Sequence, residues 1–536
     1  MSSSKIHNIG SRRELFLDNF LVESLRGGAV RRFHHPVRRE VVLTMDGPNE
    51  FSNAPGYLCI VQDGKRHLLY YRTGGRVRPP GGRENTNFFL CVAETHDGKT
   101  FRRCPVGLLP ESPHAVLNNA MTADIAPDPG YNFCPGVCEV FLDTNPACPK
   151  EERFKMLVSD ETRGWEWDDE GGWMPNGGIF LFVSPDGFRF RRKSTTHFAI
   201  PGRPCYDSGN LAFWDPAIGA YRVYLRQYKK MYGAILRTIQ TTTTPDFVHF
   251  QPLKTLRFNP AFQRLFADGQ QLYTNNVLPY FRAPHIFLGL SVRYYDSEAY
   301  NETMLNLPAV ELRAFRAGLS PRFASAVTET VLISSRDGLH FQGVGESFLR
   351  PGPNMEDANW IYGDTAFARG IIQTRSDQGH GAPDELSFYF VEGYGTAGTA
   401  RIRRCTLRMD GFASIHFPAH GGTLLTKPLV FSGDRITLNI STGAFGNFKV
   451  ALLTPEGDPI HGYTLEDALP SRGDGLALLP CWKGCIGDVR PLAGRPVRLL
   501  VEARDADLYS LQFVRAKGEL VLPAPLKIDS SDCHWH

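Results

Sequence analysis

The sequence predicts an all-β protein, a five-bladed β-propeller followed by a β-sandwich. The main observation is a short phrase that recurs along the chain. It consists of an apolar run, then Ser or Thr, then Asp-Gly, then an aromatic residue three positions after the Gly. The phrase occurs at 95–101, 184–190 and 335–341, without its Gly at 244–250, and in shortened form at 409–412. Aromatic residues at 12%, with 52 Gly and 38 Pro, also favour many short strands joined by turns.

Each copy of the phrase marks one hairpin. Asp-Gly supplies the left-handed backbone of a tight turn, and the aromatic residue packs the next strand. A second hairpin precedes each phrase, so every repeat holds four antiparallel strands, as a propeller blade does. We expect blades at 54–108, 132–195, 206–255, 274–348 and 361–416. The strand-like segment 13–18 is expected to close the ring, and 110–131 and 295–325 are insertions, which are often functional loops.

The residue pattern of the sequence changes after residue 416. Smoothly alternating strand-like runs follow, separated by Gly, Asp and Pro turns and without the phrase, which is typical of a β-sandwich. A chain of 536 residues is also too long for one core. We therefore expect a catalytic propeller at 1–416, an accessory sandwich at 417–522 with a structural or sugar-binding role, and a tail at 523–536.

Composition and charge exclude several classes. The formal charge is only +3, and no basic run with interleaved aromatics occurs, so nucleic acid is not an expected partner. No stretch approaches the ~20 apolar residues of a membrane helix, and the first ten residues contain no signal-peptide core. The 11 Cys are scattered without a disulfide-framework spacing, which indicates a reducing compartment and a cytoplasmic protein.

Polar residues gather at one predicted opening of the propeller. The first strand of each blade lines the central channel and the second runs back, so the start of the first and the end of the second lie at the same mouth. Side chains that donate and accept hydrogen bonds there suit a polyhydroxylated ligand, so a carbohydrate is the expected partner. The predicted substrate-binding residues are Arg72, Asn132, Asp160, Asn210, Arg226, Asn275, Arg293 and Asp364.

Two carboxyl groups at this mouth would carry glycoside hydrolysis, one protonated and one ionised. Asp207 precedes the central strand of the third blade and is the expected ionised group. Glu392 lies between an apolar strand and a Tyr/Gly loop, where burial raises a carboxyl pKa, so it is the expected general acid. Glu50 and Asp364 are the reserves for this pair.

These residues also have structural interpretations. Asp207 fits an Asx turn, Glu392 fits an ion pair with Arg72 or Arg401, and the strand-end arginines fit contacts between blades. The Asp of each Asp-Gly phrase is expected to form its turn. Asn and Asp oxygens in the channel suit a divalent cation such as Ca²⁺, but no dedicated loop spacing occurs, so neither a cofactor nor a metal site is predicted.

Several longer segments add a resemblance. They are RELFLD at 13–18, DSGNLAFWDP at 207–216, PYFRAPHI at 279–286 and SSRDGLHF at 334–341. These segments, and the ending from 427 to 510, resemble a bacterial group of five-bladed propeller proteins similar to invertase- and fructosidase-type glycoside hydrolases of families 32 and 43. The resemblance implies three acidic residues from different blades around a funnel. The invertase signatures Asn-Asp-Pro-Asn-Gly, Arg-Asp-Pro and Glu-Cys are absent, so Asp207 and Glu392 rest on geometry alone.

The predicted function is an exo-acting glycoside hydrolase that cleaves a small glycoside or oligosaccharide with inversion. The first alternative is a noncatalytic propeller that binds sugars or a protein partner, because fold does not fix function. The second is a sugar lyase or isomerase, which needs a Tyr or His base beside Arg, and Tyr394 with Arg72 meets that need. The sequence leaves open whether the chain forms a homo-oligomer.

Overall fold

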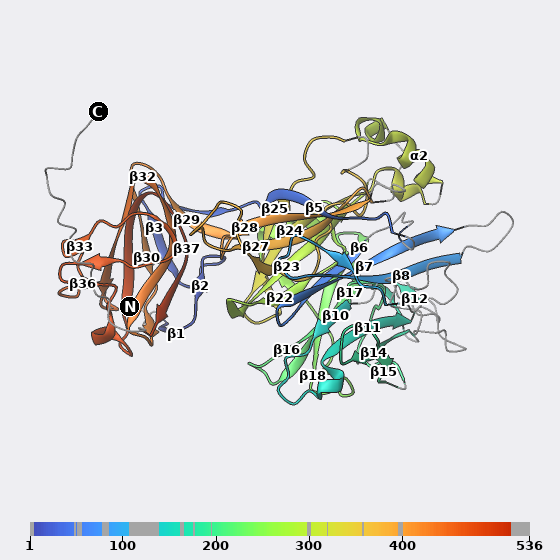
Figure 1. Cartoon of the computed structure of the whole chain (residues 1–536), viewed down its shortest axis with the longest axis horizontal. Coiled ribbons are helices and arrows are strands. Elements are labelled where there is room, and N and C mark those ends of the chain that lie inside the picture. The colour runs from blue at the N-terminus through green and yellow to red at the C-terminus, as the bar shows by residue number, and fades with distance from the viewer. Residues whose placement is uncertain are drawn as a thin grey trace. The chain divides into compact units, whose positions relative to one another are not determined.

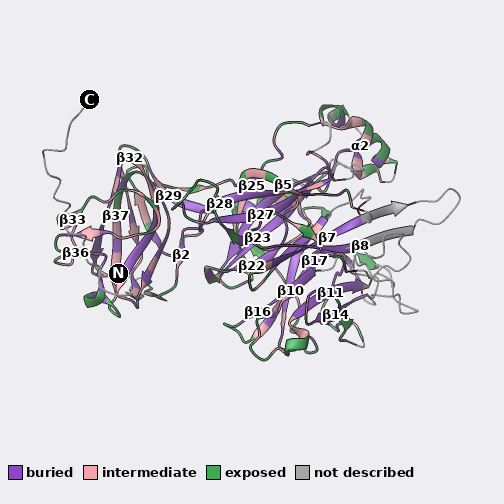
Figure 2. Cartoon of the chain, in the orientation of Figure 1, coloured by how far each residue is buried: buried purple, intermediate pink, exposed green. Residues whose placement is uncertain are grey.

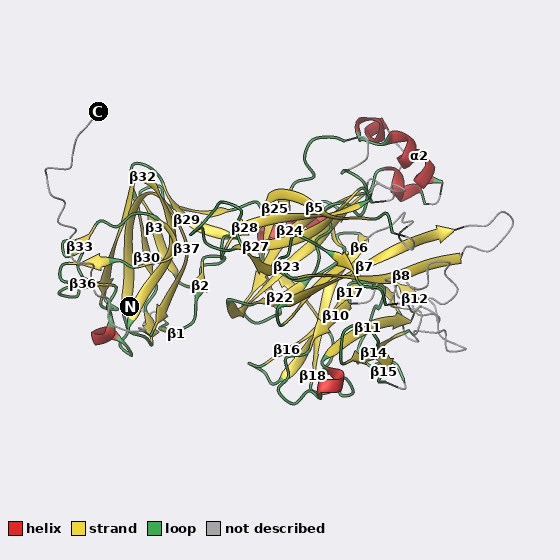
Figure 3. Cartoon of the chain, in the orientation of Figure 1, coloured by secondary structure: helices red, strands yellow, loops and turns green. Residues whose placement is uncertain are grey.

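The computed structural model separates the chain into two compact units (Figure 1). Unit 1 joins Met1–Arg32 to Ala413–His536, and unit 2 is Phe33–Phe412. Strands dominate both units (Figure 3), which confirms the all-β class. The structure describes residues 5–47, 50, 56–77, 85–106, 139–160, 166–174, 177–194, 196–296, 302–318, 320–355, 359–394 and 400–515.

The described residues of unit 2 form five sheets of four or more strands, antiparallel except for the pair of β20 (Arg257–Phe258) and β25 (His340–Leu349), in each of which the strands mostly follow one another in sequence. The first sheet is β6 (Gly56–Asp63), β7 (Arg66–Val77), β8 (Asn85–Thr95) and β9 (Arg102–Arg103). The second is β10 (Glu139–Leu142), β11 (Phe154–Asp160), β14 (Gly178–Ser184) and β15 (Arg191–Arg192). The third is β16 (Leu211–Asp215), β17 (Ala220–Met231), β18 (Ala234–Thr244) and β19 (Lys254–Thr255).

The fourth and fifth sheets depart from this simple order. The fourth has six strands: β20 (Arg257–Phe258), β21 (Gln271–Leu272), β22 (Val277–Tyr280), β23 (Ala283–Tyr295), β24 (Val327–Ser335) and β25 (His340–Leu349). The fifth is β26 (Ile372–Thr374), β27 (Glu385–Glu392), β28 (Arg401–Arg408) and, from the start of the unit, β5 (Val37–Thr44). A small pair, β12 (Glu166–Asp168) and β13 (Gly171–Trp173), stands apart from the five.

Apolar clusters join these sheets in a closed order. One cluster packs the first sheet on the second, another the second on the third, and another the third on the fourth. Phe348 on β25 contacts Phe388 on β27 with ring centroids 5.8 Å apart, which links the fourth sheet to the fifth. A further cluster packs the fifth sheet on the first. The five sheets therefore follow one another cyclically, and the buried residues lie along their strands (Figure 2).

The expectation that segment 13–18 closes the ring is wrong. Its strand β2 (Glu14–Leu15) pairs antiparallel with β37 (Arg498–Val514) of unit 1, and Phe16 is buried in the unit 1 core. The strand that completes the fifth sheet is instead β5, which pairs with β28 from Arg401–Thr44 to Thr406–Val37. The final strand predicted for the fifth blade is β29 (Ala413–Phe417), which also pairs with β37.

The recurring phrase forms turns of the expected kind. In the turn at 184–190 the Asp186 carboxylate accepts the backbone N–H groups of Phe188 and Arg189 at 2.8 and 3.1 Å. The Ser184 hydroxyl accepts the N–H of Gly187, whose φ is +83°. The same carboxylate and hydroxyl contacts recur at Asp97 and at Asp337, so these aspartates are turn formers.

A tyrosine from the preceding sheet holds most of these turns. The hydroxyl of Tyr70 donates to the Gly187 carbonyl at 2.9 Å, Tyr224 to that of Gly338 at 2.8 Å, and Tyr389 to that of Gly98 at 2.6 Å. Tyr280 likewise donates to Asp410 at 2.7 Å. Each buried bond contributes about 1 kcal/mol. The phrase thus recurs because each copy makes the same kind of contact between neighbouring sheets.

Insertion 295–325 carries the helix α2 (Val310–Ala317) and short 3₁₀ turns at Glu302–Asn306 and Pro321–Ala324. The other helix of the described residues, α1 (Pro260–Ala267), follows β20 and buries Phe262 and Phe266. Insertion 110–131 lies outside the described residues. Among the residues that the structure describes, no helix is long and apolar enough to cross a bilayer.

Unit 1 is built around long strands. β37 pairs with β2, β29, β30 (Gly422–Thr426) and β32 (Arg435–Leu453), and β3 (Val22–Arg26), β4 (Val30–Phe33) and β34 (Asp474–Leu478) extend this sheet. β1 (His7–Gly10) pairs in parallel with β31 (Leu429–Phe431), and β33 (Ala468–Leu469), β35 (Cys481–Trp482) and β36 (Cys485–Ile486) form a small third sheet. Trp482 is buried in the core, and its indole N–H donates to the Val450 carbonyl at 2.8 Å.

Candidate active site

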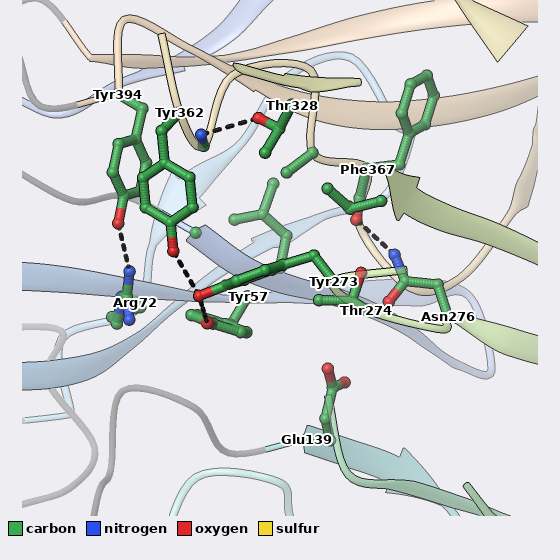
Figure 4. Close-up of a pocket in the computed structure, with 15 residues that line it drawn as sticks. Tyr57, Arg72, Glu139, Tyr273, Thr274, Asn276, Thr328, Tyr362, Phe367 and Tyr394 are labelled. Carbon is green, nitrogen blue, oxygen red and sulfur yellow. Dashed lines mark hydrogen bonds between the residues drawn. The ribbon is translucent and has the colours of Figure 1, made fainter. Parts of the chain in front are cut away.

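A pocket in unit 2 lies where the first strands of four sheets begin (Figure 4). Gly56, Tyr57 and Leu58 reach it from the start of β6, and Glu139 is the first residue of β10. The fourth sheet contributes Asn276, which precedes β22, and the fifth contributes Ala366 and Phe367 ahead of β26. The ends of second strands reach the same place through Arg72, Val292 and Tyr394. The pocket therefore occupies the position expected for the mouth, with a volume of about 40 Å³.

Four tyrosines form the wall of the pocket. The hydroxyls of Tyr57 and Tyr362 both donate to the hydroxyl of Tyr273, the first at 3.3 Å. The hydroxyl of Tyr394 accepts a hydrogen bond from Arg72 at 3.0 Å (Figure 4). The rings of Tyr362 and Tyr394 meet edge to face, with centroids 5.5 Å apart. Aromatic faces beside hydroxyl and guanidinium donors can bind both the apolar and the polar side of a sugar ring.

The backbone around this pocket is unusual at two points. Tyr57 and Asn276 have φ angles of 47° and 48°, in the left-handed region that non-glycine residues rarely adopt. Two hydrogen bonds from its side-chain amide hold Asn276 there: Nδ2 donates to the Leu290 carbonyl at 3.0 Å and to the Phe367 carbonyl at 2.9 Å. Such conformations persist where surrounding contacts impose them, and they cluster at functional sites.

Glu139 is a buried carboxyl group that points into the pocket (Figure 4). Its Oε2 accepts a hydrogen bond from Arg369 at 3.2 Å, and Oε1 has no hydrogen-bond partner among the described residues. Burial raises the pKa of Glu139 to about 7, although the Arg369 charge and hydrogen bond oppose the shift. A carboxyl group with this pKa and one open oxygen can donate a proton near neutral pH.

Asp207 lies beside the same tyrosines and has the opposite pKa shift. Its Oδ2 accepts hydrogen bonds from Arg226 and from the Tyr228 hydroxyl, the latter at 2.9 Å, whereas Oδ1 has no partner among the described residues. Burial alone would raise the pKa of Asp207, but the Arg226 charge and these hydrogen bonds lower it below its usual value. Its ion-pair partner Arg226 stacks on Tyr273, with the guanidinium carbon 4.1 Å from the ring centroid, which links Asp207 to the wall of the pocket.

The Tyr273 phenol is the most polarised group of the wall. The guanidinium carbon of Arg226 lies 4.1 Å from its ring centroid and that of Arg237 lies 5.5 Å away. Burial would raise the pKa of Tyr273, but these two charges and the hydrogen bond from Tyr362 together lower it below its usual value. A lowered pKa makes this phenol more acidic than an ordinary tyrosine, as a tyrosine base requires.

The other two predicted catalytic carboxylates are held by ion pairs. Glu392 accepts hydrogen bonds from Arg403 on Oε1 at 2.9 Å and from Arg401 on Oε2 at 3.0 Å. Glu50 accepts from Arg103 on both oxygens, at 2.9 and 2.6 Å, and also from Tyr71 and the backbone of Gly47. Neither residue lines the pocket. Both oxygens of each are occupied, which matches the structural ion pair considered for Glu392.

Several predicted binding residues lie around the pocket without lining it. Asn210 donates to the Ser159 hydroxyl at 3.0 Å and to the Tyr206 carbonyl at 2.9 Å, and Asn275 donates to the Gly209 carbonyl at 2.6 Å. Asp364 accepts the N–H groups of Tyr394 and Ile361, and burial raises its pKa to about 8. These residues position the segments that carry the tyrosines.

The remaining predicted binding residues have other places. Arg293 pairs with Glu329 and lines a neighbouring groove with Gln270 and Trp360. Asp160 ends β11, where its backbone pairs with Gly178. Asn132 lies outside the described residues. Of the predicted binding residues, Arg72 is therefore the one that the structure places in the wall of this pocket.

Sequence reasoning missed Glu139 and the tyrosine wall. Glu139 stands at the start of a first strand, which is the position that predicted the other candidates, but the start of that strand was assigned to Asn132. Tyr57 is the second residue of β6, Tyr273 lies four residues before β22, and Tyr362 lies ten residues before β26. No shared position in the sequence marks these three, and Tyr394 is the one member of the wall named above, for the lyase alternative.

The described residues contain no cluster of three or more His, Cys, Asp or Glu side chains that could hold a metal ion. Cys481 and Cys485 are free thiols, and the other closely spaced cysteines, 134 and 138, lie outside the described residues.

Comparisons with known proteins give distant likenesses. No family model matches the chain, and no curated protein matches it. Among solved structures, it is similar to an arabinoxylan arabinofuranohydrolase of glycoside hydrolase family 43 from Bacillus subtilis, with 11% identity over 89% of this chain and 99% of that one, at a TM-score of 0.38. An N-acetylgalactosamine deacetylase from F. plautii has 11% identity over 71% and 96% of the two chains, at a TM-score of 0.39. An endo-arabinase from Bacteroides thetaiotaomicron has 9% identity over 70% of this chain and 98% of that one, at a TM-score of 0.37.

Proposed function

We propose that unit 2 is a five-bladed β-propeller that hydrolyses glycosidic bonds, with Glu139 as general acid and Asp207 as general base. The cyclic packing of its five sheets supports the propeller. One observation carries the function: beside the same pocket, two buried or half-buried carboxyl groups each keep an open oxygen and have pKa values displaced in opposite directions. Such a pair can supply the acid and the base of glycoside hydrolysis.

The reaction follows from these two states. Glu139 donates its proton to the glycosidic oxygen as the bond from that oxygen to the anomeric carbon breaks. A water molecule attacks the anomeric carbon from the opposite side, and Asp207 accepts the proton that the water loses. The products are a free alcohol and a sugar of inverted configuration. The small, walled pocket is consistent with recognition of one chain end and thus with exo action.

The leaving group distinguishes the two carboxyl groups. A good leaving group, such as dinitrophenol, departs without a proton, whereas a sugar alcohol needs one. Glu139→Gln should therefore retain cleavage of dinitrophenyl glycosides and lose about 10²- to 10⁴-fold on natural glycosides. Asp207→Asn should lose activity on both, because each reaction needs an activated water.

Glu392→Gln is the matched control, since it removes a buried carboxylate of the same unit whose oxygens are both held by arginines. It should keep its kcat/KM on both kinds of substrate. Full activity of Glu139→Gln on natural glycosides would refute the acid assignment. Loss of activity in a folded Glu392→Gln protein would return the acid role to that residue.

A second candidate function is a sugar lyase, which Tyr273 favours. A phenolate flanked by Arg226 and Arg237 could remove the proton next to a sugar carboxylate and so start elimination of the glycosidic oxygen. A lyase forms an unsaturated product with strong ultraviolet absorption, and a hydrolase does not. Product spectra, with Tyr273→Phe as the diagnostic variant, decide between the two.

A further inference from the structure

The tyrosine wall is backed by an excess of positive charge. Five guanidinium groups stack on its four rings at 4.1–5.8 Å from ring centroids to guanidinium carbons. They are Arg72 on Tyr57, Arg226 and Arg237 on Tyr273, Arg316 on Tyr362 and Tyr394, and Arg322 on Tyr362. They come from two of the sheets and from the insertion that carries α2, so separate parts of unit 2 deliver the same charge to one place.

Few negative groups balance these charges. For Arg226, Arg237, Arg316 and Arg322, the one carboxylate in ion-pair contact within the described residues is Asp207, which pairs with Arg226. Arg237 instead donates to the Gln271 side chain at 2.7 Å and to the Tyr228 hydroxyl at 3.2 Å, and Arg322 donates to the Tyr294 hydroxyl at 3.3 Å. Arg237 and Arg322 are partly exposed, whereas Arg316 is buried without a carboxylate partner among the described residues. Buried charge is costly without an opposite charge, so Arg316 indicates a missing anion.

Unused hydrogen-bond donors lie in the same region. Nη1 of Arg316, a residue 8% exposed, and Nε of Arg226, a residue 2% exposed, are buried and have no hydrogen-bond partner. The Thr274 hydroxyl, in the pocket lining, is also buried without a partner. Buried donors are almost always satisfied in folded proteins, so unpaired donors beside a pocket point to an absent ligand.

The pocket has the size of a small charged group. A water molecule needs about 10–15 Å³ on this measure, so a volume of about 40 Å³ has room for about three water molecules, which is the space of one small oxyanion group. A carboxylate has three heavy atoms, and its oxygens would meet Arg72, the Thr274 hydroxyl and the tyrosine hydroxyls of the wall. An acidic substituent therefore fits inside this space, with the sugar ring that carries it at the opening beside Glu139.

We infer that the substrate is an acidic sugar, whose carboxylate or sulfate ester binds in this pocket against the tyrosine wall and the arginines behind it. Arginine suits this task because its fork of donors matches planar and tetrahedral oxyanions and stays charged. The inference rests on the proposed function for the reaction, but it concerns binding and is tested without turnover.

The test is titration calorimetry of wild-type protein with glucuronate, galacturonate, glucose 6-sulfate and the neutral sugars glucose and galactose. The acidic sugars should bind, with an affinity that falls as salt is added, and the neutral sugars should not. Uronate and sulfate arms identify which oxyanion is preferred. Arg72→Gln removes a donor of the pocket wall and Arg316→Gln removes a positive charge behind Tyr362 and Tyr394, so each should weaken acidic-sugar binding about 10- to 100-fold.

Arg222→Gln is the matched control, because Arg222 also stacks on an aromatic ring in unit 2 but pairs with Asp215 away from the pocket. It should bind acidic sugars as the wild type does, and thermal unfolding verifies that each variant is folded. Equal binding of neutral and acidic sugars, absence of acidic-sugar binding up to millimolar concentration, or unchanged binding in both the Arg72→Gln and Arg316→Gln variants would overturn the inference. Glu139→Gln separates it from the proposed function, since this variant should bind acidic sugars even where cleavage is absent.

Discussion

The raised pKa of Glu139 makes the stability of unit 2 depend on pH in a way that a single substitution should remove. The group has a pKa of about 7 in the folded protein against an ordinary value of 4.5, so the folded state binds this proton more tightly. Its stabilising contribution is fully present below about pH 4.5 and is lost as the pH rises through about 7. A shift of this size corresponds to about 3 kcal/mol, of which about 2 to 3 kcal/mol is lost between pH 5 and pH 8.

The Glu139→Gln variant has no titrating group at this position, so its free energy of unfolding should not fall in this way as the pH rises. Relative to wild type, the variant should gain about 2 to 3 kcal/mol on going from pH 5 to pH 8, whatever its stability at either pH. Urea unfolding followed by tryptophan fluorescence measures this difference for unit 2, which contains five of the seven tryptophans. Glu456→Gln, at an exposed position of unit 1, controls for removal of one carboxylate. A relative stability that stays constant between the two pH values would refute the assigned burial of Glu139.

Three further predictions concern the turns and the proton donor. Gly187→Ala should destabilise unit 2 by about 2 to 4 kcal/mol in urea unfolding, because φ is +83° and an added Cβ would lie 2.7 Å from the Tyr70 hydroxyl oxygen. Gly219→Ala is the control and should cost about 1 kcal/mol, because the space around Gly219 is open. Tyr224→Phe should cost about 1 to 2 kcal/mol in the same assay by leaving the Gly338 carbonyl unpaired, while Tyr232→Phe, at an exposed position, should cost less than 0.5 kcal/mol. Arg369→Met removes a charge that lowers the pKa of Glu139, so the alkaline fall of kcat/KM should move to higher pH, and an unmoved pH profile would argue against Glu139 as the acid.

The turns of the fold could be read from local sequence. Asp186 and Gly187 are adjacent to the groups that they bind, so a seven-residue phrase holds all the information that its turn needs. The closing strand could not be read in this way. β5 pairs with β28 across more than 350 residues, and both β5 and segment 13–18 look like strands, so the choice between them depends on packing of the whole chain.

The sequence indicated the place of the candidate pocket better than the residues that line it. The rule that first-strand starts and second-strand ends share one mouth led to Arg72, at a second-strand end, and it applies to Glu139 once β10 is known to begin there. The ion pairs of Glu392 depend on the register of two strands, in which Glu392 stands opposite Arg401, and register is not visible in a single segment. The pKa of Glu139 likewise depends on burial by neighbouring sheets.

The pairing of β5 with β28 has a consequence for synthesis. Residues 37–44 leave the ribosome early, and the strand that they join, Arg401–Arg408, is made only after more than 350 further residues. Until then the N-terminal strand presents unpaired backbone groups, which other strands can capture. A chain that stops before residue 400 lacks this partner, so we expect such fragments to aggregate and the protein to tolerate shortening of its tail far better than loss of β28.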